Sequence, residues 1–163
     1  MTVGIRGFTE LFCSRAANAI GLSSTSGTRI AIASTAAGHA YAAALAPEAA
    51  EGLLADMERE IPESAKLLRP HLGADRYALR ERGYVTSCGL WSPHINGLAI
   101  PLWSPQYQTY VVVTIGLLSN IYDEMRLHRD VAPRLLELSV SIKGLLEDGE
   151  STLFAQRTQS GAL

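Results

Sequence analysis

The sequence predicts one α+β domain built on a mainly antiparallel sheet of about six strands with flanking helices. Strand-like runs separated by helical segments are typical of this fold class. The chain has 163 residues, of which 47% are hydrophobic and 18% charged, values usual for one globular domain with a sizeable core. We expect the domain to span residues 1–148, and residues 149–163, which are polar and lack periodicity, to form a tail.

In the first half of the chain, turn-forming residues and helical spacing of apolar residues set the expected boundaries. The first pair of strands is a hairpin around a turn at residues 7–9. Gly83 ends the helix expected at 63–82 as a residue just past its C-terminus. The expected elements are strands at 2–6 and 10–15, a loop at 18–27, a strand at 29–33, and helices at 36–45, from Pro47 to Ile61-Pro62, and at 63–82 with a break near Pro70 and Gly73.

The second half of the chain is predicted to form three strands and a final helix. The strands are expected at 84–87, 95–103 and 109–117, with a turn at 104–107 between the last two. Asp130 is a suitable cap for the last helix because it leaves Pro133 in the first turn, where proline is tolerated. The apolar face of this helix is predicted to carry Leu135, Leu138, Ile142 and Leu145.

The segment Ser34-Thr35-Ala36-Ala37-Gly38-His39 is the most informative part of the chain. Ser34 and Thr35 are good helix N-cap residues, and the first turn after them has almost no side-chain bulk. Unpaired N–H groups and the helix dipole make such a helix start suitable for an anion. The alternative is that Thr35 only caps the helix and that the small residues allow close packing.

Several segments together resemble the IclR family of transcription regulators. Gly27-Thr28-Arg29-Ile30 followed by Thr-Ala-Ala-Gly-His-Ala at 35–40 resembles one family signature. Arg80-Glu-Arg-Gly-Tyr84 resembles the family's helix-to-strand junction, and 96–102 resembles a strand of its sheet. The resemblance covers residues 3–148 and the family's C-terminal, effector-binding domain. It implies a sheet like that of GAF and profilin domains.

The resemblance also implies where an effector pocket lies: between the start of the small-residue helix and one face of the sheet. Thr35, Ala36, Ala37 and Gly38 would form the anion cradle. Ser87 falls where some small-acid-binding members have an acidic residue, and Gly97 where a member can have a cysteine. Thr114 and Gly116 fall where the family often has two serines. This pocket has therefore lost bulk and polar groups, which favours a larger ligand.

Aromatic and aliphatic residues near these positions favour an aromatic or medium-sized organic acid. The expected wall consists of Tyr84, Leu90 and Trp91, next to Cys88, together with Ile30 and Ile32. The alternative is that Tyr84 and Trp91 are ordinary core aromatics.

Two other classes of function remain open at this point. Cys88 with His39 or His94 would be the nucleophilic pair of a small-acid hydrolase or isomerase, although the sequence contains no complete triad. The second alternative is that the domain is a GAF-like interaction module that binds no small ligand. Some members of the resembled family hold zinc, but the spacing of a metal site is not present here, and no cofactor is expected.

The net charge, the cysteine spacing and the lack of a targeting signal indicate which partners and which cellular location to expect. The net charge is −2, which disfavours DNA binding by this chain alone. The resemblance places DNA binding in a helix-turn-helix domain that has no counterpart in these residues. Cys13 and Cys88 lack the spacing of a metal or redox motif, and neither a signal peptide nor a membrane-length apolar run is present. We expect a cytoplasmic homodimer or tetramer. An exposed apolar surface on Leu117, Leu118 and Ile121 would serve for association, although the sequence does not locate the interface.

Overall fold

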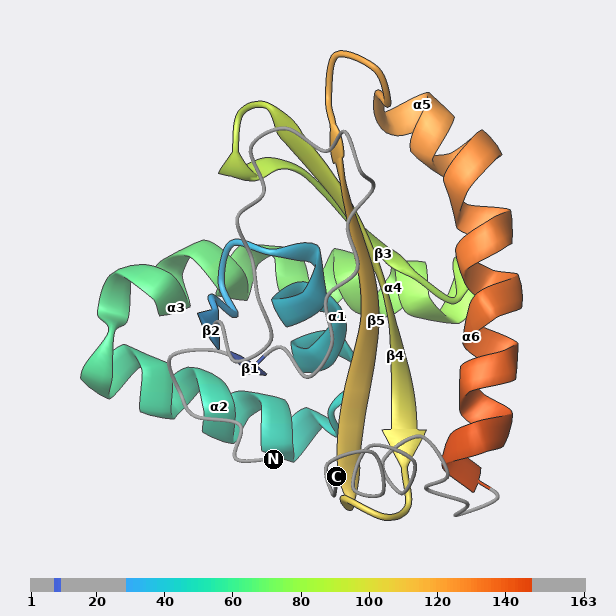
Figure 1. Ribbon diagram of the computed structural model, residues 1–163. Helices are drawn as coiled ribbons and strands as arrows, with labels where there is room; N and C mark the ends of the chain where they lie inside the picture. The colour runs from blue at the N-terminus through green and yellow to red at the C-terminus, as the bar shows by residue number, and fades with distance from the viewer. Residues whose placement is uncertain (1–7, 10–28, 148–163) are drawn as a thin grey trace, which may run out of the picture.

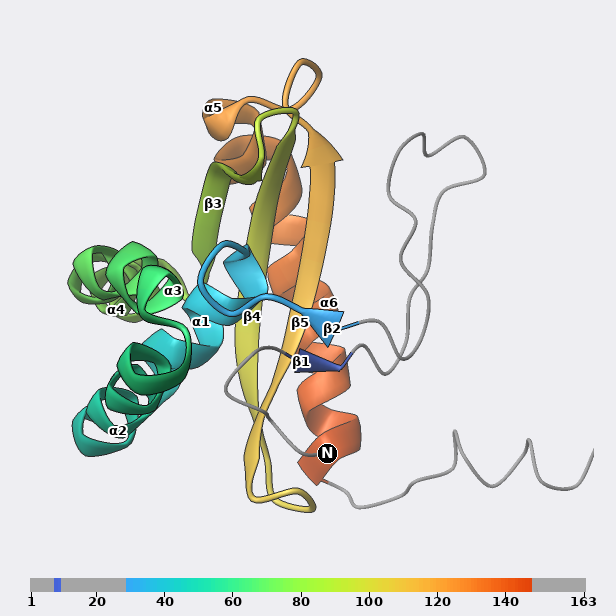
Figure 2. The same ribbon diagram turned by 90° about the vertical axis from the view of Figure 1, so that its left-hand side faces the viewer.

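The structure, a computed structural model, describes residues 8–9 and 29–147. A three-stranded antiparallel sheet forms the middle layer (Figure 1). Helices α1 to α4 cover one face of the sheet and helix α6 covers the other (Figure 2). The arrangement confirms the α+β class.

The element bounds follow the sequence expectations between residues 36 and 118, except that β3 continues five residues beyond the strand expected at 84–87. The helices are α1 (Ala36–Ala44), α2 (Pro47–Glu60), α3 (Pro62–Leu68), the 3-10 turn η1 (Arg69–His71), α4 (Leu72–Arg82), α5 (Glu124–Arg126), the π-helical segment η2 (Leu127–Val131) and α6 (Ala132–Glu147). The strands are β1 (Phe8–Thr9), β2 (Arg29–Ile30), β3 (Val85–Ser92), β4 (Ile95–Ser104) and β5 (Thr109–Leu118).

The sheet is smaller among the described residues than the sequence predicts. The order is β3-β4-β5, and β1 and β2 form a separate two-stranded ladder, so a single sheet of about six strands is not seen in this part of the chain. The turn expected at Phe8 and Thr9 is wrong, because these residues pair with Ile30 and Arg29. A pairing partner some twenty residues away leaves no local signal. The expected strands at 2–6 and 10–15, the loop at 18–27 and the tail at 149–163 lie outside the described residues.

Local chemistry explains the helix ends on the α1 side of the sheet. Pro47 and Pro62 each occupy a first helical turn, where the missing N–H costs nothing. The predicted break near Pro70 is the 3-10 turn η1. Gly83 ends α4 with φ 79°, a left-handed conformation that glycine adopts without strain.

The start of the last helical segment differs from the expectation. Asp123, not Asp130, is the cap: its side chain accepts a hydrogen bond from the N–H of Arg126 at 2.8 Å. Asp130 instead pairs with Arg129. The π-helical segment η2 ends two residues before Pro133, which lacks the N–H that a regular helix would use there.

The expected apolar face of α6 is only half correct. Leu135 is buried and Ile142 packs against the core, but Leu138 and Leu145 are 50% and 53% exposed. Leu136 and Leu146 pack in their place. No described helix is long and apolar enough to cross a membrane.

Alternating residues of the strands divide the core between the two faces. Val85 and Ala99 pack with Ala36 and Ala40 on the α1 face. Tyr84, Leu98, Ile100 and Leu102 pack with Ala132 and Leu135 on the α6 face. A residue on β3, β4 or β5 can therefore be assigned to a face from its neighbours in the strand.

Candidate anion-binding site at the start of helix α1

Helix α1 begins against the sheet, with its first turn capped by Thr35. The Thr35 Oγ1 atom accepts a hydrogen bond from Gly38 N at 3.2 Å, and Thr35 O accepts one from His39 N at 3.0 Å. None of the described residues accepts a hydrogen bond from the N–H groups of Ala36 and Ala37. The structure thus leaves two donors at the positive end of the helix dipole, as the first positions of a helix require.

Small residues are needed here because two backbones meet. A Cβ atom on Gly38 would lie 2.0 Å from Ile32 O and 2.3 Å from Ile32 Cα, so residues 31–35 fold back directly onto the helix. At Gly97 a Cβ would lie 3.0 Å from the Cβ of Ala36. Gly38 therefore has a structural role, while the Ala36 contact places the start of α1 on strand β4.

The structure brings together four of the predicted pocket residues from all three strands. Ser87 pairs with Gly97, and Gly97 pairs with Gly116, so these three residues form one row across the sheet. Thr114 lies two residues before Gly116 on the same face of β5, opposite Ala99, and its hydroxyl donates to Leu98 O at 3.1 Å. Ala36 contacts the middle of the row, and Val85, Ala99 and Val112 of the same face pack beside it. The row is a strip of small residues next to the free donors of α1.

Two other predicted pocket residues lie on the opposite face. Tyr84 packs against α6, and its hydroxyl is 2.8 Å from Nδ1 of His128. Cys88 follows Ser87 and so points away from α1, and it lies within electrostatic range of Glu124 on α5. Their expected place in the wall is wrong, because the sequence pattern did not separate neighbouring residues by face.

The hydrophobic wall is also different from the expectation. Leu90 and Trp91 lie in the β3–β4 hairpin, beyond the irregular pairing that begins at Cys88, and Trp91 is 53% exposed. Trp91 is thus not a core aromatic. Ile32 is fully buried in the core under α1 and α2, so it does not line an open site.

His39 is the residue that sequence reasoning misjudged, having considered it only as a partner for Cys88. Its ring is 1% exposed, with Nδ1 2.7 Å from Asp75 Oδ2 and Nε2 2.9 Å from Ala33 O. Both ring nitrogens are therefore engaged, and neither is available to a cysteine. The available signal was a lone histidine within the apolar helix 36–45.

The Cys88 thiol is poorly suited to nucleophilic attack. Partial burial and then the charge of Glu124 raise its pKa, and a thiol with a raised pKa stays protonated and unreactive near neutral pH. No hydrogen bond or ion pair joins it to His94 among the described residues. Within residues 29–147, no three His, Cys, Asp or Glu side chains are grouped as a metal site.

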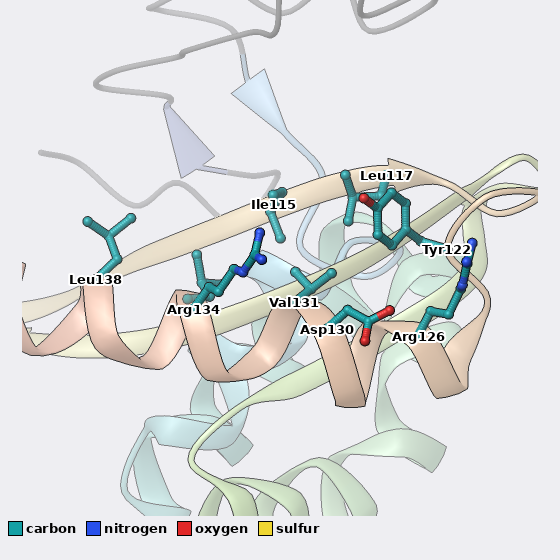
Figure 3. A pocket seen from close by; sticks show the side chains of 9 residues that line it. Ile115, Leu117, Tyr122, Arg126, Asp130, Val131, Arg134 and Leu138 are labelled. Atoms are coloured by element: carbon teal, nitrogen blue, oxygen red, sulfur yellow. The ribbon is translucent and has the colours of Figure 1, made fainter.

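A hollow of about 530 Å³ lies on the other face of the sheet, between the end of β5 and the helical segment α5–α6 (Figure 3). Its floor is apolar, with Ile115, Leu117, Val131, Leu135 and Leu138 contributing. Charged side chains of Arg126, Asp130 and Arg134 line one side. The hollow is separated from Ala36 and Ala37 by the sheet, so it is a different surface from the predicted pocket.

Comparison with solved structures shows that the fold is similar to that of IclR-family transcriptional regulators. An IclR-family transcriptional regulator from Brucella abortus matches with a TM-score of 0.70 and 25% identity over 78% of this chain and 48% of that one. HmgR from Pseudomonas aeruginosa matches with a TM-score of 0.67 and 22% identity, over 89% of this chain and 57% of that one. The chain spans about half the length of these two proteins.

A third match is to an isolated domain. The inducer-binding domain of the PobR transcription factor from Acinetobacter, a double mutant in complex with 3-hydroxybenzoic acid, has a TM-score of 0.59 and 18% identity, over 74% of this chain and 70% of that one. No protein-family model and no curated protein matches the sequence. The fold of this chain is that of the effector-binding domain of IclR-family regulators, which confirms the resemblance read from the sequence.

Proposed function

We propose that the chain is the ligand-sensing domain of an IclR-type transcription regulator and that it binds a small organic acid at the start of α1. The observation that carries the proposal is the pair of unpaired N–H groups on Ala36 and Ala37 beside the row Ser87–Gly97–Gly116. Backbone donors at a helix start bind carboxylates, and the exposed positions Thr114 and Gly116 on the same face leave room for the body of the acid.

An aromatic acid is the ligand class that fits best. Glycine at the exposed position 116 leaves side-chain volume free on this face, whereas the space at Gly97 is filled by Ala36. Trp91 exposes half of its surface in the adjoining hairpin. The inducer-binding domain with a similar fold holds 3-hydroxybenzoic acid. We infer that the carboxylate of a hydroxybenzoate-sized acid lies at Ala36 and Ala37 and that Trp91 contacts its ring.

The proposed mechanism is a shift between arrangements of an oligomer. An acid that binds one arrangement better than another changes the DNA affinity of the whole regulator through that difference, typically by about 1–3 kcal/mol. DNA is contacted by a helix-turn-helix domain of the whole protein, in the cytoplasm, and the domain itself is not an enzyme.

The site is tested by thermal shift and calorimetry with pyruvate, benzoate, 3-hydroxybenzoate and phenylacetate. An acid at about 100 times its Kd adds about 2.7 kcal/mol to the unfolding free energy. Gly116→Val fills the space over the row at an exposed position and is expected to abolish binding. Thr114→Val removes one hydroxyl and is expected to weaken it. Thr86→Val, the same change on the opposite face, is the control, and equal binding by all variants would refute the site.

Ala37→Leu is a second test of the donors. Ala37 is only 5% exposed, so leucine there blocks the anion position and also costs about 1–3 kcal/mol of stability through overpacking. Ala49→Leu, at an exposed position of α2, is the matched control. A folded Ala37→Leu protein that binds the acid normally would place the site elsewhere.

The size of the ligand is tested separately with Trp91→Ala. We expect this change to weaken 3-hydroxybenzoate more than pyruvate, because only the larger acid reaches the indole. Trp103→Ala, which removes a 44% exposed tryptophan near the end of β4, is the control. If Trp91→Ala lowers the affinity for both acids equally, the ligand is a two- or three-carbon acid instead.

We also infer that two copies associate through the surface around the hollow on the α6 face. Leu117 and Leu138 line the hollow, Leu138 is 50% exposed, and Ile121, next in sequence to the lining residue Tyr122, is 48% exposed. Several exposed apolar side chains near one hollow are typical of an interface. Leu138→Glu is expected to reduce the light-scattering mass at tens of micromolar to that of a monomer, and Tyr77→Glu, on α4, is the control. A monomeric parent chain would contradict the inference.

A further inference from the structure

Both ring nitrogens of His39 face oxygen atoms of other residues. Nε2 faces Ala33 O at 2.9 Å, and a carbonyl oxygen only accepts, so Nε2 carries a hydrogen. Nδ1 lies 2.7 Å from Asp75 Oδ2, so the protonated ring donates to this carboxylate as well. The ring is 1% exposed, so water does not compete for either position. The geometry describes a buried ion pair that joins α1 to α4.

The same ring fixes the segment 31–35 that leads into α1. Ala33 belongs to this segment, and Thr35 Oγ1 ties it further by donating to Ala31 O at 2.7 Å. The Ile32 backbone lies in direct contact with Gly38. Among these contacts, the bond from His39 is the one that also connects the segment to another helix, through Asp75. The direction of the Ala36 and Ala37 N–H groups depends on how this segment enters the helix.

We propose that His39 is a positioning residue for the anion site. As an imidazolium it ties the segment 31–35 to Asp75 on α4, and it thereby orients the donors of Ala36 and Ala37 and places a positive charge within about one helical turn of the bound carboxylate. The proposal rests on the proposed function for the identity of the ligand, but the clamp itself can be observed without any ligand.

A consequence is that acid binding depends on pH. Burial by itself lowers the pKa of His39, but the hydrogen bonds to Asp75 and Ala33 and the charge of Asp75 outweigh it and raise the pKa above its usual value. His71 on η1 is a further titratable side chain beside the ring, with ring centroids 5.4 Å apart. Affinity should therefore be constant below the raised pKa and fall as the pH rises through it.

The first experiment uses the ligand-free protein. Nitrogen-15 NMR of the histidine rings reports whether both nitrogens of His39 carry hydrogens, and proton–nitrogen spectra follow the amides of Ala36 and Ala37. We expect the doubly protonated form at pH 6.5, and amide shifts that titrate with the ring. A neutral His39 ring at pH 6.5, or Ala36 and Ala37 amides that do not respond to its titration, would overturn the proposal.

The second experiment measures binding of 3-hydroxybenzoate and pyruvate by calorimetry between pH 5.5 and 8.5. His39→Gln keeps a donor for one partner but has no charge, and we expect about a tenfold loss of affinity at pH 6 and no pH dependence from this residue. That loss is about 1.4 kcal/mol, the size of one hydrogen bond to a charged group. Asp75→Asn, which keeps the shape of its side chain, is expected to lower the pKa of His39 and move the pH profile to lower pH.

His71→Gln is the control, because it removes a neighbouring exposed histidine without breaking the clamp. If His39→Gln does not fold, the Asp75→Asn profile and the NMR titration decide the question. Normal affinity and an unchanged pH profile in folded Asp75→Asn would overturn the proposal. If neither acid binds the parent chain, the proposed function fails for these ligands, while the ring and amide titrations still support or refute the clamp.

Discussion

Replacement of Gly38 by alanine is the most direct test of how the candidate site is built. The added Cβ would lie 2.0, 2.3 and 2.4 Å from the O, Cα and C atoms of Ile32. These are backbone atoms, so no side-chain rotation relieves the contact. To restore about 3 Å, the segment 31–35 must move by about 1 Å, the difference between 3.0 and 2.0 Å. Such a shift lengthens the 2.9 Å bond from His39 to Ala33 O.

The expected cost follows from these contacts. Overpacking a well-packed site costs about 1–3 kcal/mol, and a weakened hydrogen bond to a charged group adds about 1.5 kcal/mol. The gain of about 0.5–1 kcal/mol that alanine brings to a helix interior offsets part of this. We therefore expect Gly38→Ala to lower the unfolding free energy by about 2–4 kcal/mol, which corresponds to a decrease in Tm of about 5–15 °C.

Gly52→Ala provides the matched control. Gly52 lies inside α2, and a Cβ there meets no atom within 4 Å. The same substitution should thus stabilise the protein by about 0.5–1 kcal/mol. Urea denaturation of both variants and the parent measures the two effects with opposite signs. A Gly38→Ala protein as stable as the parent would refute the close packing of residues 31–35 on α1.

Three further outcomes are expected. Thr35→Ala should cost about 1 kcal/mol of stability as a lost cap, measured against Thr86→Ala by urea denaturation. The pKa of His39 is raised in the fold, so its stabilising contribution should be fully present below the unfolded pKa of about 6.5 and disappear as the pH rises through the folded value. His39→Gln should abolish this pH dependence of the unfolding free energy. A parent chain whose stability does not fall over that pH range would contradict the prediction. Cys88, whose pKa is raised, should alkylate more slowly at pH 7 than a model thiol in peptide mapping, and a faster rate would contradict the assignment.

Much of the fold was predictable because its signals are local. Proline at 47 and 62 and glycine at 83 act through their own backbone geometry, and they mark helix ends in any context. The small residues after Thr35 indicated a helix start with free donors, and its cap is formed as expected. The row Ser87–Gly97–Gly116 was inferred from a resemblance, and the strand register brings its members together.

The remaining features depend on contacts between distant segments. Tyr84 and Cys88 were assigned to the pocket because they adjoin Ser87, but the face of each residue is set by pairing with β4 and packing of α6. Asp130 is a residue type that commonly caps helices. Asp123 is the cap instead, because the helical segment starts earlier and reaches Pro133 through a π-helical segment.

The sequence by itself determined the α+β class, most helix boundaries and the small-residue start of α1, because these follow from residue size, backbone freedom and periodicity. Only the tertiary structure decided what His39 does. The role of His39 depends on its contacts with Asp75, 36 residues away on α4, and with a carbonyl oxygen six residues before it. Neither partner is specified by the residues next to His39, since a buried ion pair exists only once the helices have packed.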